Sequence, residues 1–286
     1  NNEIKALKIL EVDSQKRYTY DIDKVIFAIG HSSRDTYKTL YSKGVAMENK
    51  PFAIGVRIEH LRKDIDKMQY GEAVSNPLLE AATYNMAFNN KKETRGTFSF
   101  CMCPGGEIVN ASSELGASLV NGMSYSTRSG KFSNSAIVVG ISEKDYGDQI
   151  FSGMYLQEKL EKKNYEIVGT YGAIYQNVID FMKHKKTTFE IESSYKMKLF
   201  SYDINSFFPD YITRNLQSAF ENWSKNNLFI SEKVNLIGPE TRTSAPVKIL
   251  RDLKGESISI KGLFPIGEGA GYAGGIMSAA VDGIKI

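Results

Sequence analysis

The sequence predicts an α+β fold, and three observations lead to this prediction. Short strand patterns dominate the first half of the chain, among them residues 51–60, where apolar and polar side chains alternate. Helical patterns follow, at residues 149–160, 174–182 and 211–223. The last stretch combines a short apolar strand, a glycine-rich turn and a helix. Runs of strands followed by runs of helices are typical of α+β proteins.

The first fifty residues predict a small αβ unit. Residues 4–12 and 17–20 form two short strands around a polar turn. Residues 25–29 are continuously apolar and end at Gly30, as in a strand buried on both faces. His31 follows, and a helix is expected from an N-cap at Ser33 to a C-terminal cap at Gly44.

The next strand, residues 51–60, places apolar side chains on one face and Arg57 and Glu59 on the other. We expect this strand to be half-buried, with the charged pair on an open, solvated, salt-bridged face. Further strands are expected at residues 84–88, 97–103 and 135–141.

Two cysteines, Cys101 and Cys103, stand one residue apart just before a Pro104-Gly105 turn. Residues 107–111 then return as a strand, so a hairpin is expected. Alternation along a strand would place both thiols on one face. They form either a redox pair or two buried small side chains, since unpaired cysteine is among the most buried residue types.

Two loops stand out further along the chain. Residues 112–131 form a hydroxyl-rich loop that is longer than an ordinary connection, and such loops are usually functional or disordered. Residues 240–244 lie between Pro239 and Pro246 and offer Arg242 and several hydroxyls. This second loop is either an anion-binding site or an ordinary connection.

The C-terminal stretch begins with an apolar strand at residues 263–266 and continues as a helix expected to be buried. Gly269, Gly271 and Gly274 spell G-x-G-x-x-G, a weak signal by itself. The dinucleotide fingerprint needs a βαβ unit and an acidic residue about 20 positions later, and the residues up to Ile286 leave room for neither. The order of strand, glycine turn and helix places free backbone N–H groups and a positive helix end at the turn, which suits a phosphate or an electron-rich ring. The alternative is a turn that only packs one helix tightly on a sheet.

Composition narrows the function classes. The net charge of +3 comes from Lys and Arg scattered among Asp and Glu, unlike the basic stripe of a nucleic-acid binder. No apolar run is long enough to cross a membrane, and we expect no secretory signal peptide. Two adjacent-but-one cysteines exclude a disulfide framework and fit a cytoplasmic setting. The spacing of His and Cys suggests no metal site.

Five ordered motifs resemble those of uncharacterised bacterial FAD-dependent dehydrogenases, which are related to aminoacetone-oxidase-like flavoproteins. They are IGVRIEH (54–60), SFCMCPGG (99–106), NGMSY (121–125), GPETRTS (238–244) and GEGAGYAGG (267–275). The resemblance implies an FAD-dependent oxidoreductase that acts on a small, anionic substrate, with NAD(P)H as a further expected electron donor. It implies a cofactor site made of Gly30, His31, Gly267, Glu268, Gly269, Ala270, Gly271, Tyr272, Ala273, Gly274, Gly275 and Ile276. Arg242 and Cys103 are the catalytic candidates.

The resemblance also implies a domain organisation. Residues 1–50 and 236–286 would form the remainder of a Rossmann-like FAD domain, and residues 51–235 an inserted, mostly antiparallel cap domain with helices. The pyrophosphate-binding G-x-G-x-x-G half is expected upstream, so the chain would be a C-terminal portion whose partner is its own N-terminal half. The rival hypothesis is a non-catalytic ligand-binding or interaction module.

Overall fold

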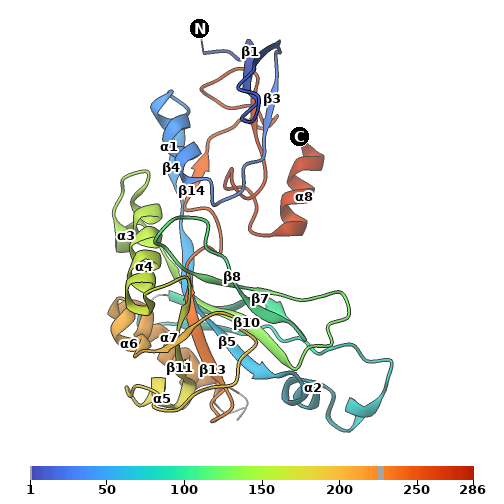
Figure 1. Cartoon of the computed structure of the whole chain (residues 1–286), viewed down its shortest axis with the longest axis vertical. Coiled ribbons are helices and arrows are strands. Elements are labelled where there is room, and N and C mark those ends of the chain that lie inside the picture. Colours follow the sequence, from blue (N-terminus) through green and yellow to red (C-terminus); the bar gives the residue numbers. More distant parts are fainter. Residues whose placement is uncertain (1, 94, 225–228) are drawn as a thin grey trace. The chain divides into compact units, whose positions relative to one another are not determined.

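The computed structural model describes residues 2–93, 95–224 and 229–286, and both helices and strands occur along them (Figure 1). The predicted α+β class is confirmed. The chain forms two compact units. Unit 1 comprises Asn1–Phe52, Ser142–Tyr155 and Ser244–Ile286, and unit 2 comprises Ala53–Ile141 and Leu156–Thr243. The assignment of the predicted ranges to a nucleotide domain and a cap domain stays a prediction.

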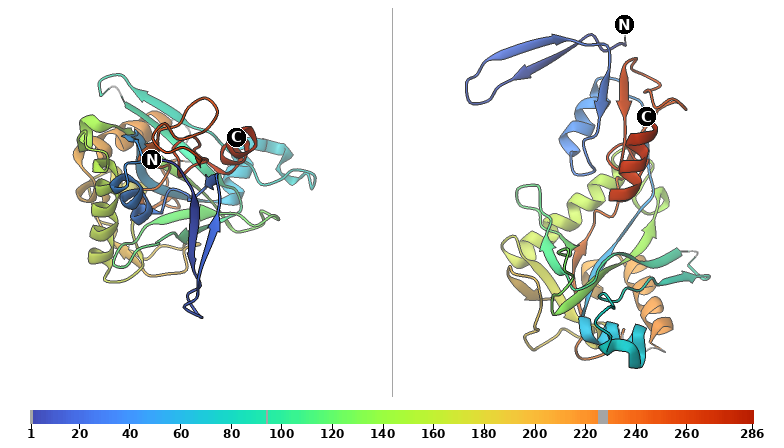
Figure 2. Two further views of the ribbon diagram at one scale, coloured as in Figure 1. Left: turned by 90° about the horizontal axis from the view of Figure 1, so that it is seen from above. Right: turned by 90° about the vertical axis from the view of Figure 1, so that its right-hand side faces the viewer.

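Unit 1 is built from three strand pairs and the helices between them. The hairpin of β1 (Ala6–Leu10) and β2 (Arg17–Asp21) projects from the rest of the unit, as Figure 2 shows. The strand β3 (Val25–Phe27) pairs in parallel with β15 (Leu263–Pro265), and β4 (Met47–Asn49) pairs antiparallel with β14 (Val247–Ile249). The helices are α1 (Arg34–Ser42), α3 (Glu143–Tyr146), the start of α4 (Ser152–Val168) and α8 (Ile276–Lys285).

The core of unit 1 lies between α1, α4 and the β4–β14 pair. Tyr37, Met47, Met154, Val247 and Leu263 are buried together there. Two predictions of burial in this unit are wrong.

The strand at residues 25–29 was expected to be buried on both faces, yet β3 covers three residues and Ile26 is 68% exposed. The last helix was also expected to be buried. In the structure α8 turns its apolar side chains outward and buries Asp282 instead, because that carboxylate is held by Arg251 and the backbone of Gly267.

Unit 2 contains a seven-stranded sheet in the order β12-β11-β13-β5-β10-β7-β6. The pairs β11–β13, β13–β5, β10–β7 and β6–β7 are antiparallel, whereas β11–β12 is parallel. The strands are β5 (Phe52–Leu61), β6 (Ala87–Asn90), β7 (Arg95–Cys103), β10 (Phe132–Ile141), β11 (Ala173–Asn177), β12 (Leu199–Ser201) and β13 (Asn235–Glu240).

Helices and a separate hairpin cover this sheet. The helix α7 (Asp210–Trp223), at its predicted position, contacts β6, β7 and β10, while α5 (Val178–Met182) and α6 (Ile204–Phe207) contact β11. The hairpin of β8 (Glu107–Asn110) and β9 (Val120–Met123) shares an apolar cluster with β11 and β13. The helix α2 (Arg62–Tyr70) and a 3₁₀ turn (Gly71–Ser75) follow β5.

Two local predictions in the middle of the chain are wrong, and a third, for the helix now called α4, is right in type but has different bounds. Residues 174–182 form a strand followed by a helix, because residues 174–177 pair with β13 and Asn177 then caps α5 by accepting a hydrogen bond from Ile179 N–H. The helix expected at 149–160 begins at Ser152 and continues to Val168. The expected hairpin does not form, since β8 pairs with β9 and β7 pairs with β10.

Candidate functional site

The parallel pairing of β3 with β15 brings two predicted cofactor segments to one edge. Leu263 lies beside Val25 and Pro265 beside Phe27, so the carboxyl ends of both strands coincide. Gly30 and His31 follow the first strand, and Gly267 and Glu268 follow the second. His31 Nδ1 lies 3.0 Å from Glu268 Oε1, and each side chain is less than a quarter exposed. We call residues 30–31 and 267–276 the flavin-edge site, after the cofactor role predicted for them from the sequence.

Tyr37 links the loop at Gly30 to the loop at Gly269 through its hydroxyl group. Its hydroxyl donates to the carbonyl of Gly269 at 2.7 Å and lies 3.2 Å from the carbonyl of Gly30. Burial, and secondarily the negative charge of Glu268, raises the pKa of Tyr37. The phenol therefore remains a hydrogen-bond donor throughout the physiological pH range, which keeps the Gly30 and Gly269 loops in register.

The glycines of the turn fall into two groups. A Cβ on Gly269 would lie 2.4 Å from the Gly30 carbonyl oxygen, and one on Gly271 would lie 2.7 Å from the Val247 oxygen. These two glycines are required by packing against the chain's own backbone. By contrast, a Cβ on Gly274 or Gly275 would meet no heavy atom within 4 Å. Only the second group leaves an open approach to the backbone.

Some backbone donors of the turn are already engaged. The Gly271 N–H donates to the carbonyl of Glu268 at 2.9 Å, and the Tyr272 N–H donates to that of Gly267 at 3.2 Å. The Gly274 N–H lies 3.2 Å from the Ser278 hydroxyl. The N–H groups of Gly271, Tyr272 and Gly274 are therefore bonded within the chain. Backbone donors for a cofactor would lie nearer the start of α8, where a helix N-terminus favours negative charge.

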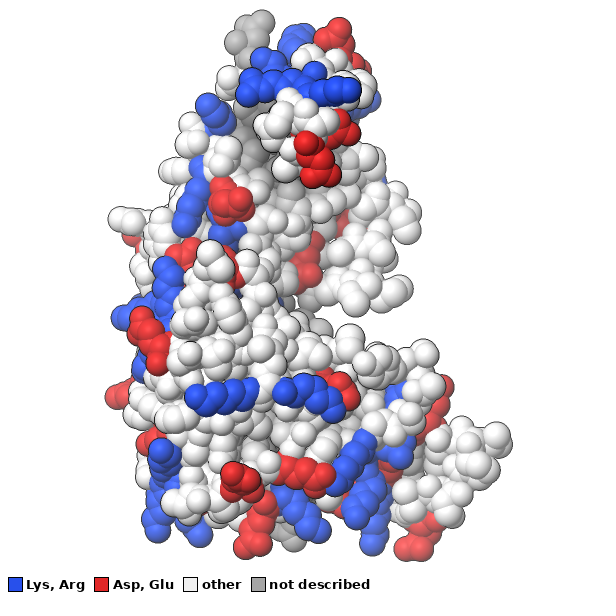
Figure 3. Space-filling model, viewed as in Figure 1, with Lys and Arg blue, Asp and Glu red and all other residues white. Residues whose placement is uncertain are grey.

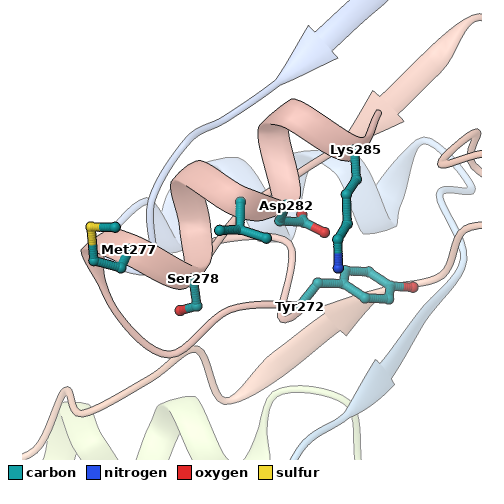
Figure 4. A pocket seen from close by; sticks show the side chains of 6 residues that line it. Tyr272, Met277, Ser278, Asp282 and Lys285 are labelled. Atoms are coloured by element: carbon teal, nitrogen blue, oxygen red, sulfur yellow. The ribbon is translucent and has the colours of Figure 1, made fainter.

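The helix α8 is held in place by one carboxylate. Asp282 forms a two-point ion pair with Arg251 and accepts a 2.7 Å bond from Gly267 N–H. Arg251 lies 3.7 Å over the Tyr272 ring. Figure 4 shows the adjoining pocket of about 390 Å³, lined by Tyr272, Met277, Ser278, Val281, Asp282 and Lys285. The Arg251 guanidinium holds the pKa of Asp282 below its ordinary value of 3.8.

Asp282→Asn is expected to loosen α8 and to lower the free energy of unfolding of unit 1 by about 1.5–3 kcal/mol, because the charge-assisted bonds to Arg251 are lost. A carboxylate with a depressed pKa stabilises the folded state above its unfolded pKa and loses that effect as the pH falls. The unfolding free energy of the parent chain should therefore decline below about pH 4, and that of the variant should decline less. Urea titrations at several pH values measure both quantities. Identical pH profiles for the two chains would contradict the assigned role of Asp282.

A second constellation lies in unit 2 around Arg57. The expectation that Arg57 and Glu59 lie on an open face is wrong, because both are buried, with Arg57 fully enclosed. The β8–β9 hairpin packs over the sheet face that carries them, where Ile108 and Val120 contact Ile237, the register partner of Arg57.

All five donor hydrogens of the Arg57 guanidinium have an acceptor. Nε donates to Asn134 Oδ1 at 2.7 Å. Nη1 donates to Glu240 Oε2 at 2.8 Å and to Asn121 Oδ1 at 3.1 Å. Nη2 donates to the Cys101 carbonyl at 2.6 Å and lies 3.7 Å from Cys103 Sγ. We call these six residues the Arg57 cluster. Pairing and full hydrogen bonding are what permit a charge to be buried.

Four of the five motifs noted in the sequence converge on the Arg57 cluster. Arg57, Cys101 with Cys103, Asn121 and Glu240 each come from a different one of them. Gly122 belongs here too, since a Cβ on it would lie 2.4 Å from Arg57 Nη2. Sequence reasoning missed Asn134, whose only signal is a run of three polar residues (133–135) within a strand that is buried.

The two cysteines do not share a face as predicted. Cys101 is exposed, with a φ of +44°, whereas Cys103 is buried. The β7–β10 register shifts between the Asn134–Cys103 and Ala136–Phe100 pairs, so Cys101 lies in a bulge that interrupts the alternation. Burial raises the pKa of the Cys103 thiol, which keeps it neutral and a weak nucleophile.

Cys103→Ala is expected to lower the free energy of unfolding of unit 2 by about 1–2 kcal/mol, because it removes a buried group that contacts Arg57. The exposed Cys101→Ala should stay within about 0.5 kcal/mol of the parent chain. Thermal or urea unfolding of the two single variants distinguishes these effects. A Cys101–Cys103 disulfide that forms under mild oxidation, detected by mass spectrometry, would favour the redox pair instead.

Arg242 is engaged within unit 2. Its Nε and Nη2 donate to the two carboxylate oxygens of Glu161 at 2.9 and 2.7 Å, and Nη1 donates to Ser113 at 2.6 Å. Glu114 lies 3.6 Å away, and Arg242 itself is buried. The guanidinium therefore faces carboxylates of its own chain, and its predicted role toward an anionic substrate stays a prediction.

In the described ranges, no group of His, Cys, Asp and Glu side chains is placed to hold a metal ion, and none of the helices is long and apolar enough to cross a bilayer. On the face drawn in Figure 3, acidic and basic side chains are interspersed.

Comparison with known proteins gives two findings. Residues 51–243 match the family model described as FAD-dependent protein, C-terminal domain-like. An uncharacterized protein of Clostridium beijerinckii is 45% identical over 269 residues, which are 92% of this chain and 50% of the relative. The chain therefore spans about half the length of this curated relative. Because the family model covers most of the chain, the protein belongs to the FAD-dependent protein, C-terminal domain-like family.

Proposed function

We propose that this chain supplies the flavin-edge half of an FAD site in an FAD-dependent oxidoreductase. One observation carries the proposal: Glu268 and His31 meet at the carboxyl ends of two parallel strands, directly before a helix. Ligands of α/β sheets bind outside the carboxyl ends of the strands, and helix N-termini favour anionic or electron-rich groups.

The residues present fit FAD. The carboxylate of Glu268 can accept a bond from a hydroxyl of the cofactor's sugar chain. Gly274 and Gly275 leave their backbone open to a flat ring, and the first turn of α8 would stabilise negative charge on it. FAD itself supplies the redox chemistry, while the protein positions it and sets the charge around it.

In this proposal unit 2 contributes the substrate side. Arg242 and Cys103 remain the catalytic candidates, and NAD(P)H remains the proposed electron donor for a small anionic substrate. The buried setting of both side chains favours a supporting role, in which they fix the loops that contact the substrate.

The rival is a binding or interaction module without redox activity. Gly269 and Gly271 favour this rival, because tight packing against the chain's own backbone is enough to explain why glycine stands at both positions. The test is to purify a protein that carries both halves of the longer relative's length and to quantify released FAD. Stoichiometric FAD supports the proposal, and a colourless, folded, stable protein that takes up no FAD on titration contradicts it.

The 286-residue chain alone is expected to bind FAD weakly or not at all, because it contains only one of the two segments that would enclose the cofactor. Calorimetric titration of FAD into the chain measures this directly. Tight, one-to-one binding would show that unit 1 forms a complete site, and the two-segment model would then be wrong.

A further inference from the structure

The helix α8 is amphipathic, but its apolar side faces solvent and its polar side, with Asp282, faces the rest of unit 1. Ile276, Met277, Val281 and Ile284 lie on one side at helical spacing and are 89, 76, 45 and 84% exposed. The opposite side is anchored by Asp282 (Figure 4). Contiguous exposed apolar surface marks an interaction site. The stripe is therefore a candidate interaction surface.

The neighbouring pair of β3 and β15 is a two-stranded sheet, and among the described residues only one of its two outer edges lacks a partner. On β15, the Leu263 carbonyl accepts from Ser257 N–H, and the Pro265 carbonyl accepts from Arg251 Nη1. Proline has no N–H to offer, so the outer edge of β15 is closed.

The outer edge of β3 is different. Val25 N–H donates to Gly262, and the Phe27 carbonyl accepts from Ile266, so both face β15. By the alternation of a strand, the N–H and C=O of Ile26 between them point to the other side. The side chain of Ile26 is 68% exposed. Parallel sheets normally have both faces covered, and an open edge is a template for another strand.

We propose that Ile26, Ile276, Met277, Val281 and Ile284 form a docking face for a strand and helix from a second polypeptide segment, one that corresponds to the half of the longer relative that this chain does not match. The added strand pairs with the outer edge of β3, as in β-strand addition, and apolar side chains cover the stripe of α8. The length of the relative supplies such a segment. A second copy of this chain offers only the three residues of β3 for the same edge.

The proposal rests on the proposed function in one respect, since the docked segment would complete the cofactor site. The docking itself needs no flavin. Strand pairing and apolar burial are expected to hold the complex together whether or not FAD is bound.

The test is co-expression of the 286-residue chain with an affinity-tagged segment equal to the unmatched half of the relative. The chain is expected to copurify in a one-to-one complex, measured by light scattering. Ile284→Glu and Ile26→Pro should each reduce the association constant at least tenfold, by a buried charge and by a missing N–H respectively.

Two matched variants serve as controls. Leu115→Glu places the same charge on a leucine of unit 2 that is also largely exposed, and Ile26→Val retains the edge N–H. Both should bind like the parent chain. Thermal unfolding of each variant chain shows whether unit 1 remains folded, so that a loss of binding is attributable to the face.

Copurification that Ile284→Glu and Ile26→Pro leave unchanged overturns the docking face, as does a homodimer of this chain that the same variants disrupt. A one-to-one complex that depends on both residues but takes up no FAD supports the docking face and contradicts the proposed function.

Discussion

Arg57→Met is expected to lower the free energy of unfolding of unit 2 by about 3–5 kcal/mol, because it leaves Glu240 buried without its counter-charge. Asn134, Asn121 and the Cys101 carbonyl lose their donor in the same step. Methionine fills much of the volume, so the expected loss is electrostatic. Urea unfolding measures this loss. A loss below about 1 kcal/mol would contradict the conclusion that Arg57 holds the Arg57 cluster together.

The pH dependence separates this mechanism from a packing defect. Burial raises the pKa of Glu240, and Arg57 opposes that rise. Without Arg57 the rise is unopposed, and a carboxyl with a raised pKa contributes stability that is lost as the pH increases. The destabilisation by Arg57→Met should therefore be smaller near pH 5 than near pH 8. Arg57→Met/Glu240→Leu should recover part of the loss at the higher pH, since it removes the unpaired charge.

Strand positions could be predicted where side chains alternate, but the burial of their second face could not. The alternation in residues 51–60 indicates which side chains share a face and is silent on what covers that face. The cover is the β8–β9 hairpin, which lies far along the chain from β5 and β13. The prediction for α8 fails for the same reason, because the pattern of apolar residues does not say what they pack against. The carboxylate of Asp282 decides which side of α8 faces inward.

The two candidate sites differ in how far the sequence reveals them. The flavin-edge site follows from two local patterns, each a strand end followed by glycine, which the β3–β15 register brings together. The Arg57 cluster could not be predicted, because Glu240 lies 183 positions from Arg57 and the intervening strands decide which polar groups meet. The bulge at Cys101 is likewise set by pairing with β10, so alternation placed both thiols on one face when only Cys103 is buried.

Glu268→Ala is expected to weaken FAD binding about ten- to a hundredfold in the protein that carries both halves, since a charge-assisted hydrogen bond contributes about 1.5–3 kcal/mol. Glu268→Gln keeps the shape and one acceptor, so it should lose only part of that affinity. His31 offers a matched comparison. His31→Ala removes the partner at 3.0 Å but leaves the carboxylate in place, and its effect should be smaller than that of Glu268→Ala.

The backbone approach to the ring needs a variant that the chain itself tolerates. Gly271 is unsuitable, because its φ is +85° and a Cβ there would press on Val247 and Lys248. Gly274 is suitable, because a Cβ there meets nothing within 4 Å in the chain and would obstruct only an approaching ligand. Gly274→Val should therefore leave thermal unfolding of the FAD-free protein unchanged and reduce FAD affinity at least tenfold. Fluorescence titration of FAD into the deflavinated protein measures both variants. If Glu268→Ala and Gly274→Val both retain the parent affinity, the C-terminal turn serves packing alone, and the cofactor must be sought elsewhere in the fold.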